Sequence, residues 1–265
     1  MKNYIKIIVT LIIVLLLKTP IGWPSSHNYL IKNPNLGTEN KSNEFIHYDF
    51  SVLFSGEHSV FNIGYIGDNF RRIRIKFVSV TKNSHNEHIY HVYGKSNVLG
   101  NTCDFQGTID IREIRLFNPM HYSVDDEYKG KGIKFQGVII ANYAMYEDSN
   151  QKHSGYFSGK VYAGWYINGK NKIIYDDIES HSDRWCNNQF IGKWKSYSTN
   201  QTKVCNWGDS RIPESGDLDK GIGEFYPNEK YWDQGWEIFY RAWWEYPELD
   251  KSKEAKKLEK LEWWK

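Results

Sequence analysis

The chain has 265 residues, 34 of them basic and 32 acidic, so its formal net charge is +2. This balance leaves no excess of positive charge to hold a phosphate backbone, and it argues against a nucleic-acid partner. After the N-terminal segments about 220 residues remain, a length that suits one all-β domain, and we see no second core.

Residues 1–26 have the layout of a secretory signal peptide. Two lysines precede an apolar run from Ile7 to Leu17, and the small pair Ser25-Ser26 follows it. An uncleaved signal anchor is the alternative, because no Ala-x-Ala-like cleavage site is present. The apolar run is shorter than a membrane span, so we expect no span in the mature chain. The segment predicts a secreted, periplasmic or cell-surface protein.

Residues 27–44 are rich in Asn, Gly, Pro and Ser and predict a linker, whereas residues 45–227 predict the folded domain. Short polar turns separate its extended runs, and consecutive runs joined in this way are expected to pair as an antiparallel meander. The predicted strands are Tyr48–Ser55, Phe70–Thr81, His88–Ser96, Asn101–Phe117, Lys131–Tyr146, Gly155–Ile167, Lys172–Asp176, Asn188–Tyr197 and Lys203–Trp207.

A short phrase, an aromatic residue followed two positions later by glycine and then by an apolar residue, occurs four times in these runs. Side chains alternate along a strand, so the three positions share one face. The four copies begin at Phe105, Phe135, Phe157 and Phe190. Glycine inside a strand favours bending or close backbone approach. A one-residue change of phase between Ile111 and Ile114 indicates a β-bulge. Together these features predict a closed barrel or a strongly curved sheet.

Residues 228–265 predict one or more helices packed on the barrel, followed by a charged tail. Asn228 is suited to cap a helix, and Pro247 ends it. Aromatic residues then recur at three- and four-residue steps on one face, at Trp232, Trp236, Phe239, Tyr240 and Trp243. Such a stripe is expected to face the core, with a partner-binding face as the alternative.

The three cysteines are Cys103, Cys186 and Cys205. Cys186 and Cys205 flank a segment that predicts a strand, a turn and a return strand, so we expect a disulfide between them across a hairpin. Cys103 would then be an unpaired thiol. The alternative is three reduced, buried cysteines, because spacing alone does not fix connectivity.

The irregular segment from Cys205 to Asn228 is the best functional candidate in the sequence, because long loops of compact domains are often functional. We expect no cofactor; a bound calcium ion is the one exception that the carboxylates of this segment and the backbone carbonyls freed by glycines allow, although the spacing does not match an EF-hand. The candidate ligands are Asp217, Asp219 and Glu224. The alternative is an Asp- and Gly-rich turn. Asp209 and Arg211 predict either ligand contacts or a structural ion pair beside Trp207.

Two stretches of this segment, Trp207–Pro213 and Gly221–Phe225, together with the Phe-x-Gly strands, resemble uncharacterised exported bacterial proteins over the last 110 residues or so. No function is attached to that family, so the resemblance implies none. The meander with a late helix also resembles a lipocalin barrel in outline. Lipocalins carry Gly-x-Trp on the first strand, whereas Gly192-Lys-Trp194 comes late in this chain.

The leading functional hypothesis is an exported β-barrel without catalytic activity that binds a small apolar or glycan-like ligand. The predicted ligand-binding residues are Trp165, Trp194, Trp207, Asp209 and Arg211. A structural or protein-interaction module of the cell envelope is the second hypothesis. A hydrolase with its site in the barrel mouth is the third, although no catalytic motif is present and the catalytic residues stay unknown.

Overall fold

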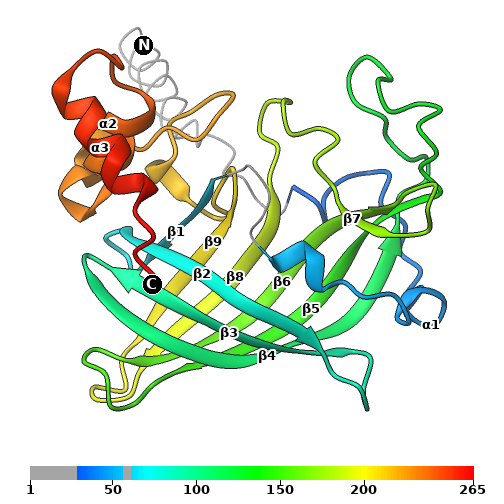
Figure 1. Ribbon diagram of the computed structural model, residues 1–265, viewed down its shortest axis with the longest axis horizontal. Coiled ribbons are helices and arrows are strands. Elements are labelled where there is room, and N and C mark those ends of the chain that lie inside the picture. Colours follow the sequence, from blue (N-terminus) through cyan, green and yellow to red (C-terminus); the bar gives the residue numbers. More distant parts are fainter. Residues whose placement is uncertain (1–28, 56–60) are drawn as a thin grey trace, which may run out of the picture.

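The computed structural model describes residues 29–55 and 61–265 (Figure 1). The signal peptide predicted over residues 1–26 lies outside this part of the chain. In the described residues, antiparallel pairing runs in the order β1-β2-β3-β4-β5-β6-β8-β9, and β9 pairs back onto β1. Eight strands therefore form a closed antiparallel barrel, and the short β7 continues the pairing along β6. The predicted all-β barrel with C-terminal helices is confirmed.

The strand bounds are β1 (Asn62–Ile66), β2 (Arg71–Lys82), β3 (Ile89–Val98), β4 (Asn101–Leu116), β5 (Phe135–Glu147), β6 (Gly155–Ile167), β7 (Ile173–Tyr175), β8 (Asn187–Ser196) and β9 (Thr202–Asp209). The helices are α1 (Ser42–Phe45), α2 (Trp236–Trp243) and α3 (Asp250–Lys260), with 3-10 helices η1 (Ser51–Phe54), η2 (Gly216–Leu218) and η3 (Glu229–Gln234). No helix of the described residues is long and apolar enough to cross a membrane.

The predicted devices for bending the sheet are present. The pairing of β4 with β5 shifts register between Ile111 and Glu113, which confirms the bulge. Gly159 of β6 lies directly opposite Gly192 of β8, and a Cβ on either glycine would collide with a backbone carbonyl of the other strand. These two strands therefore approach closely enough to exclude any side chain at this point.

One end of the barrel is filled by the chain that precedes β1. The sequence predicted a strand over Tyr48–Ser55, and this prediction is wrong, because the segment forms η1 instead. Phe50, Leu53 and Phe54 stand three and four residues apart, a helical spacing that directs them together into the barrel core. All three are almost fully buried. We call residues 45–54 the plug and this end of the barrel the plugged end.

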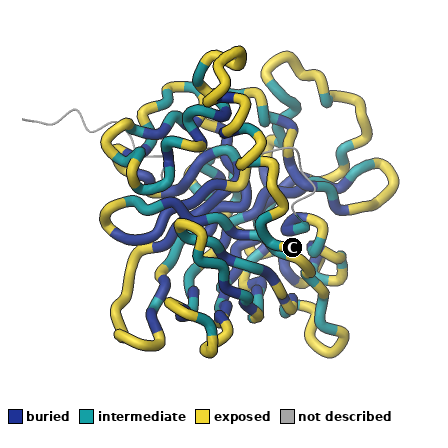
Figure 2. Tube along the Cα trace, turned by 60° about the vertical axis from the view of Figure 1, so that its left-hand side comes forward, coloured by how far each residue is buried: buried dark blue, intermediate teal, exposed yellow. Residues whose placement is uncertain are grey.

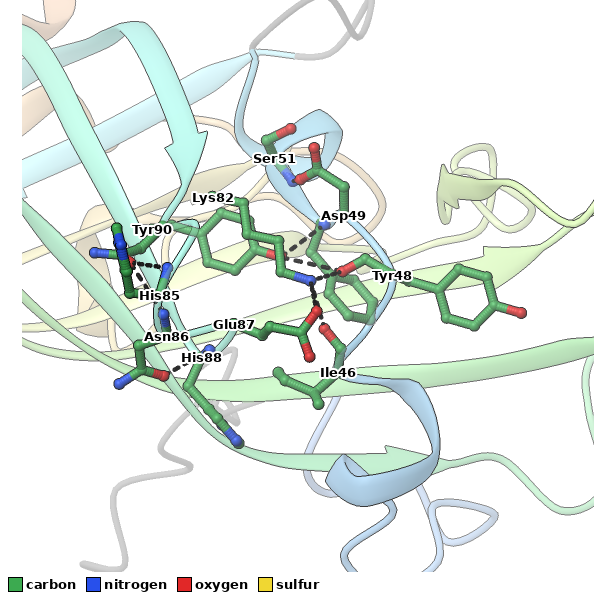
Figure 3. A network of polar contacts seen from close by, with 12 residues as sticks. Ile46, Tyr48, Asp49, Ser51, Lys82, His85, Asn86, Glu87, His88 and Tyr90 are labelled. Carbon is green, nitrogen blue, oxygen red and sulfur yellow. Dashed lines mark hydrogen bonds and ion pairs between the residues drawn. The ribbon is translucent and has the colours of Figure 1, made fainter.

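Polar contacts from the β2–β3 hairpin fix the plug in place (Figure 3). The ammonium of Lys82 donates to the carbonyls of Ile46 and Tyr48 at 2.7 and 2.9 Å. The hydroxyl of Tyr90 accepts from the backbone N–H of Phe50 at 3.0 Å. These side chains supply hydrogen-bond partners to backbone groups of the plug. In a strand, the neighbouring strand of the sheet would supply those partners.

The segment before the plug, part of the stretch predicted as a linker, contacts the barrel at several residues. Leu30 is 5% exposed and packs with Phe117, Val138 and Ile140 on the outer surface of the barrel. The backbone of Leu36 forms a β-bridge to Phe117. Apolar residues spaced among the polar ones thus give this stretch a buried side that composition alone did not reveal.

The C-terminal helices cover the outer face of β1, where Figure 1 draws them in orange and red. The side chain of Asn228 caps η3, as predicted, and Gly235 with a φ of 95° separates η3 from α2. Trp236 and Phe239 of α2 are buried against Ile63 and Tyr65 of β1. The predicted aromatic stripe therefore faces the barrel, whose buried strands Figure 2 shows in dark blue between exposed loops.

The tail that follows α2 runs back onto the outer face of β2. Arg72 donates two hydrogen bonds of 2.7 Å to the two carboxylate oxygens of Glu259 in α3. Both side chains are about nine-tenths buried. The guanidinium of Arg74 lies 5.5 Å from the ring centroid of Trp263. Ion pairing and cation–π contacts thus hold the last residues of the chain against the barrel.

Candidate functional site

The end opposite the plug contains a pocket on the barrel interior. This end carries the hairpins β1–β2, β3–β4, β5–β6 and β8–β9, and we call it the mouth. Inward-facing side chains at these strand ends enclose a cavity of about 350 Å³. Ile66, Ile73, Phe157 and Trp194 supply its apolar lining. Because they project from strands, the walls belong to the rigid framework of the fold.

One wall of the mouth pocket contains a buried carboxylate, Glu147, at the end of β5. Its Oε2 accepts hydrogen bonds from the backbone N–H of Gly155 at 2.8 Å and from Nε1 of Trp194 at 2.9 Å. The hydroxyl of Ser96 donates to its Oε1. These contacts connect four strands, β3, β5, β6 and β8, across the barrel interior.

Glu147 is only 6% exposed. Burial raises the pKa of its carboxyl, while hydrogen bonds from Ser96, Trp194 and Gly155 act in the opposite direction. Among the described residues, no basic side chain forms an ion pair with it. A carboxylate stabilised by neutral donors in the wall of a pocket is available to a donor group of a ligand.

Two cationic side chains line the same pocket, Arg71 of β2 and Lys203 of β9. Nε of Arg71 is buried and has no hydrogen-bond partner in the part of the chain that the structure describes. The ammonium of Lys203 lies 5.8 Å from the ring centroid of Trp194. The mouth pocket therefore combines apolar walls, a carboxylate and two cations, a set that can hold an amphipathic molecule.

Of the five residues that the sequence predicted to contact a ligand, only Trp194 lines the mouth pocket. Trp165 lies at the far end of β6, where its ring packs 5.5 Å from those of Phe45 and Phe50 in the plug. Trp207 is fully buried and stacks on Phe190 with centroids 4.6 Å apart. Both tryptophans fill the barrel core in this structure.

Asp209 lies at the plugged end, inside a second network of neutral donors. Its carboxylate accepts from Asn62 at 3.0 Å, from the hydroxyl of Tyr175 at 2.9 Å and from Asn188 at 2.7 Å. Asn188 also donates to the carbonyl of Leu53 in the plug. Burial raises the pKa of Asp209 to about 6 in spite of these hydrogen bonds. Asn188, whose side-chain amide also donates to Asp209, therefore links the plug to the barrel wall.

Arg211 does not pair with Asp209, in contrast to the ion pair that the sequence suggested. Its Nη1 contacts Asp219 at 2.5 Å, and its other terminal nitrogen donates to the carbonyls of Gly221 and Gly223. Arg211 also borders a second cavity, of about 390 Å³, between the loop after β9 and α2. Its charge is already compensated there, so this cavity lacks the free cation that the mouth pocket offers.

Two of the three predicted calcium ligands, Asp217 and Asp219, bind different partners, and the third, Glu224, borders the second cavity. One oxygen of Asp219 faces Arg211, and the other accepts from the backbone N–H groups of Gly221 and Tyr226. Asp217 pairs with Lys230. Among the described residues, no group of three or more His, Cys, Asp or Glu side chains is arranged to hold a metal.

All three cysteines are free thiols, so the predicted disulfide between Cys186 and Cys205 is wrong. The register of β8 and β9 places Cys205 opposite Gly192, in mid-strand. Cys186 precedes β8 and lies beside Arg211, whose carbonyl is 3.2 Å from its sulfur. Because Cys205 is closer to the turn of the hairpin than Cys186 is, the register of the two strands does not place the two cysteines opposite each other. Burial raises the pKa of Cys186 and of Cys103.

Arg71, Glu147 and Lys203 line the mouth pocket but were not predicted as site residues from the sequence. The sequence feature that could have identified them is a charged residue at a strand position whose neighbours two residues away are apolar and face the barrel interior. Arg71 shares the inward face of β2 with Ile73 and Ile75, and Lys203 shares that of β9 with Cys205 and Trp207. A charge at such a position, at the end of a strand, indicates the rim of a barrel.

Comparison of the chain with protein-family models, with curated proteins and with solved structures found no match.

Proposed function

We propose that this protein is an exported, non-enzymatic β-barrel that binds one small amphipathic ligand in its mouth pocket. The observation that carries the proposal is the difference between the two barrel ends. The plug fills one end with Phe50, Leu53 and Phe54, whereas the other end holds a cavity of about 350 Å³.

The size and lining of the mouth pocket suit a small molecule. Pockets that bind small ligands commonly measure about 300 to 1,000 Å³ and combine apolar walls with a few placed polar groups. Here the rings of Phe157 and Trp194 offer flat apolar surface, which suits either a hydrocarbon or the apolar face of a sugar ring. Glu147, Arg71 and Lys203 supply the polar groups. Export is supported by the signal-like layout of residues 1–26.

Native mass spectrometry of the protein secreted by a suitable host tests this proposal. We expect an added mass that is released under denaturing conditions. A pocket-filling variant, Val98→Trp, should lose it, because Val98 lines the mouth pocket. The matched control is Val204→Trp, on the outward face of β9, where the residue is 38% exposed. The control should keep the added mass.

A bare protein mass in the wild type would count against a bound ligand. Equal retention of the added mass by both tryptophan variants would place the ligand elsewhere. Thermal unfolding of each variant, followed by circular dichroism, verifies that the comparison is made between folded proteins. Cleavage of the signal peptide is read from the same wild-type spectrum.

A further inference from the structure

The charges of the mouth pocket are divided between two sides, and this division bears on the class of ligand; the inference rests on the proposed binding function. Ile66 of β1 is paired with Arg71 of β2 on one side and with Cys205 of β9 on the other. Lys203 is the next inward residue of β9 toward the mouth. The two cations therefore flank β1, and two strand spacings of roughly 4.8 Å, combined with the two-residue offset of Lys203 toward the mouth, put their backbones about 12 Å apart.

Neither cation is neutralised by a carboxylate in the described part of the chain. The ion pairs found there do not include Arg71 or Lys203. Arg71 in addition has a buried Nε without a partner. A guanidinium that lines a concave site without a carboxylate partner is well suited to bind a carboxylate or phosphate through two parallel hydrogen bonds.

Glu147 approaches the pocket from the opposite wall, since β5 lies four strands from β1 in either direction around the barrel. A carboxylate has about four lone-pair positions, and three donors occupy Glu147. Oε1 receives only Ser96, so it can accept one more hydrogen bond. A second anionic group at this position would be repelled, whereas a hydroxyl or ammonium group would be accepted.

We propose that the mouth pocket selects a small organic anion with a hydrogen-bond donor at its other end. The anionic group, a carboxylate or a phosphate, is bound between Arg71 and Lys203. The middle of the ligand packs against Phe157 and Trp194, and its hydroxyl or ammonium group donates to Glu147. Hydroxy acids, sugar acids and amino acids share this chemistry.

Isothermal titration calorimetry with probes matched in length tests this assignment. The six-carbon probes are 6-hydroxyhexanoate and 6-aminohexanoate, hexanoate without the terminal donor, and hexane-1,6-diol without the anion. D-glucuronate and its uncharged amide provide a sugar pair, and D-glucose 6-phosphate distinguishes a phosphate from a carboxylate. We expect saturable binding at millimolar or lower concentration only for probes that carry both groups.

Single substitutions connect that preference to the proposed residues. Arg71→Gln and Lys203→Met should each weaken binding of the preferred anion by about tenfold or more, the effect of losing a charge-assisted hydrogen bond. Lys193→Met is the matched control, because Lys193 is exposed on the outward face of β8 next to Trp194. Glu147→Gln should reduce the ratio of the affinity for 6-hydroxyhexanoate to the affinity for hexanoate.

The outcomes separate this inference from the function on which it rests. Equal affinity for glucuronate and its amide, or for the diol and the hydroxy acid, would overturn the charge assignment and leave ligand binding in place. An unchanged affinity in Arg71→Gln would do the same. No binding by any probe, together with an uncharged co-purified molecule, would also overturn it. No binding by any probe and a bare protein mass would remove both proposals.

Discussion

The two ends of the barrel contain the same kind of polar network but differ in the space around it. Each contains a buried carboxylate that accepts three hydrogen bonds from neutral groups, Glu147 at the mouth and Asp209 at the plugged end. Around Asp209 the plug fills the remaining space with apolar side chains. Around Glu147 the space is left as a cavity, and two cations, Arg71 and Lys203, line its opposite wall without an ion-pair partner among the described residues.

This contrast shows that a buried carboxylate does not by itself mark a site. Neutral donors can satisfy such a group and let it connect strands across a barrel, as Asp209 does. What distinguishes the mouth is the empty volume next to the network and the presence of Arg71 and Lys203 beside it. We therefore expect substitutions at the plugged end to lower mainly the stability of the fold, and substitutions at the mouth to lower mainly the affinity for a ligand.

The largest effect is expected from Phe50→Ala in the plug. Phe50 is fully buried, so the substitution leaves a cavity and should lower the free energy of unfolding by about 3 to 5 kcal/mol. Urea denaturation followed by circular dichroism measures it. The control is Val78→Ala, because Val78 is 50% exposed on β2. A small effect of Phe50→Ala would mean that the plug does not seal its end of the barrel.

The next effect is a dependence of stability on pH that arises at Asp209. Its folded-state pKa of about 6 lies above the ordinary value of 3.8, so between these values the folded protein binds more protons than the unfolded chain. The stabilisation is complete below the lower value and is lost as the pH rises through the higher one, by about 3 kcal/mol.

Urea denaturation of the wild type and of Asp209→Asn at about pH 4 and pH 7 measures this contribution as a difference between the two proteins. In Asp209→Asn, the free energy of unfolding should decrease much less between pH 4 and pH 7 than it does in the wild type. Glu147 contributes with the same sign, because burial raises its pKa as well, and its part should remain in the variant. Identical pH profiles of the two proteins would contradict the assignment to Asp209.

The smallest effect is expected at the mouth, from Ser96→Ala. The substitution removes one donor from Glu147 and should cost about 1 kcal/mol of unfolding free energy, the usual contribution of a single hydrogen bond. Ser79→Ala, on the exposed face of β2, is the control and should change stability less. A loss as large as that of Phe50→Ala would mean that the mouth network is as important to folding as the plug.

The sequence predicted most of the fold because long strands carry a strong alternating pattern. The bulge after Ile111 and the cap at Asn228 were both correct, since each follows from local spacing. The strand predicted over Tyr48–Ser55 was wrong, because the apolar residues of this segment have a helical spacing that the alternating pattern of a strand does not describe. The short β1 was missed, because its five residues include a glycine and depend on pairing with β2 and β9.

The candidate site was less accessible to prediction than the fold. Its three charged residues come from β2, β5 and β9, so no local motif joins them. Trp194 is the exception among the predicted ligand-binding residues, because it lines the mouth pocket. The disulfide prediction depended on a hairpin register that sequence symmetry around the turn does not support.

The pairing of β1 with β9 makes the barrel a ring that only its last strand can close. Until Asp209 and the residues before it have been synthesised, β1 and β8 each present an unpaired edge of backbone donors and acceptors. Open edges of this kind are templates for association with other chains. A fragment that ends before β9 is therefore expected to aggregate, and contacts so distant in sequence should make closure the slow step of folding.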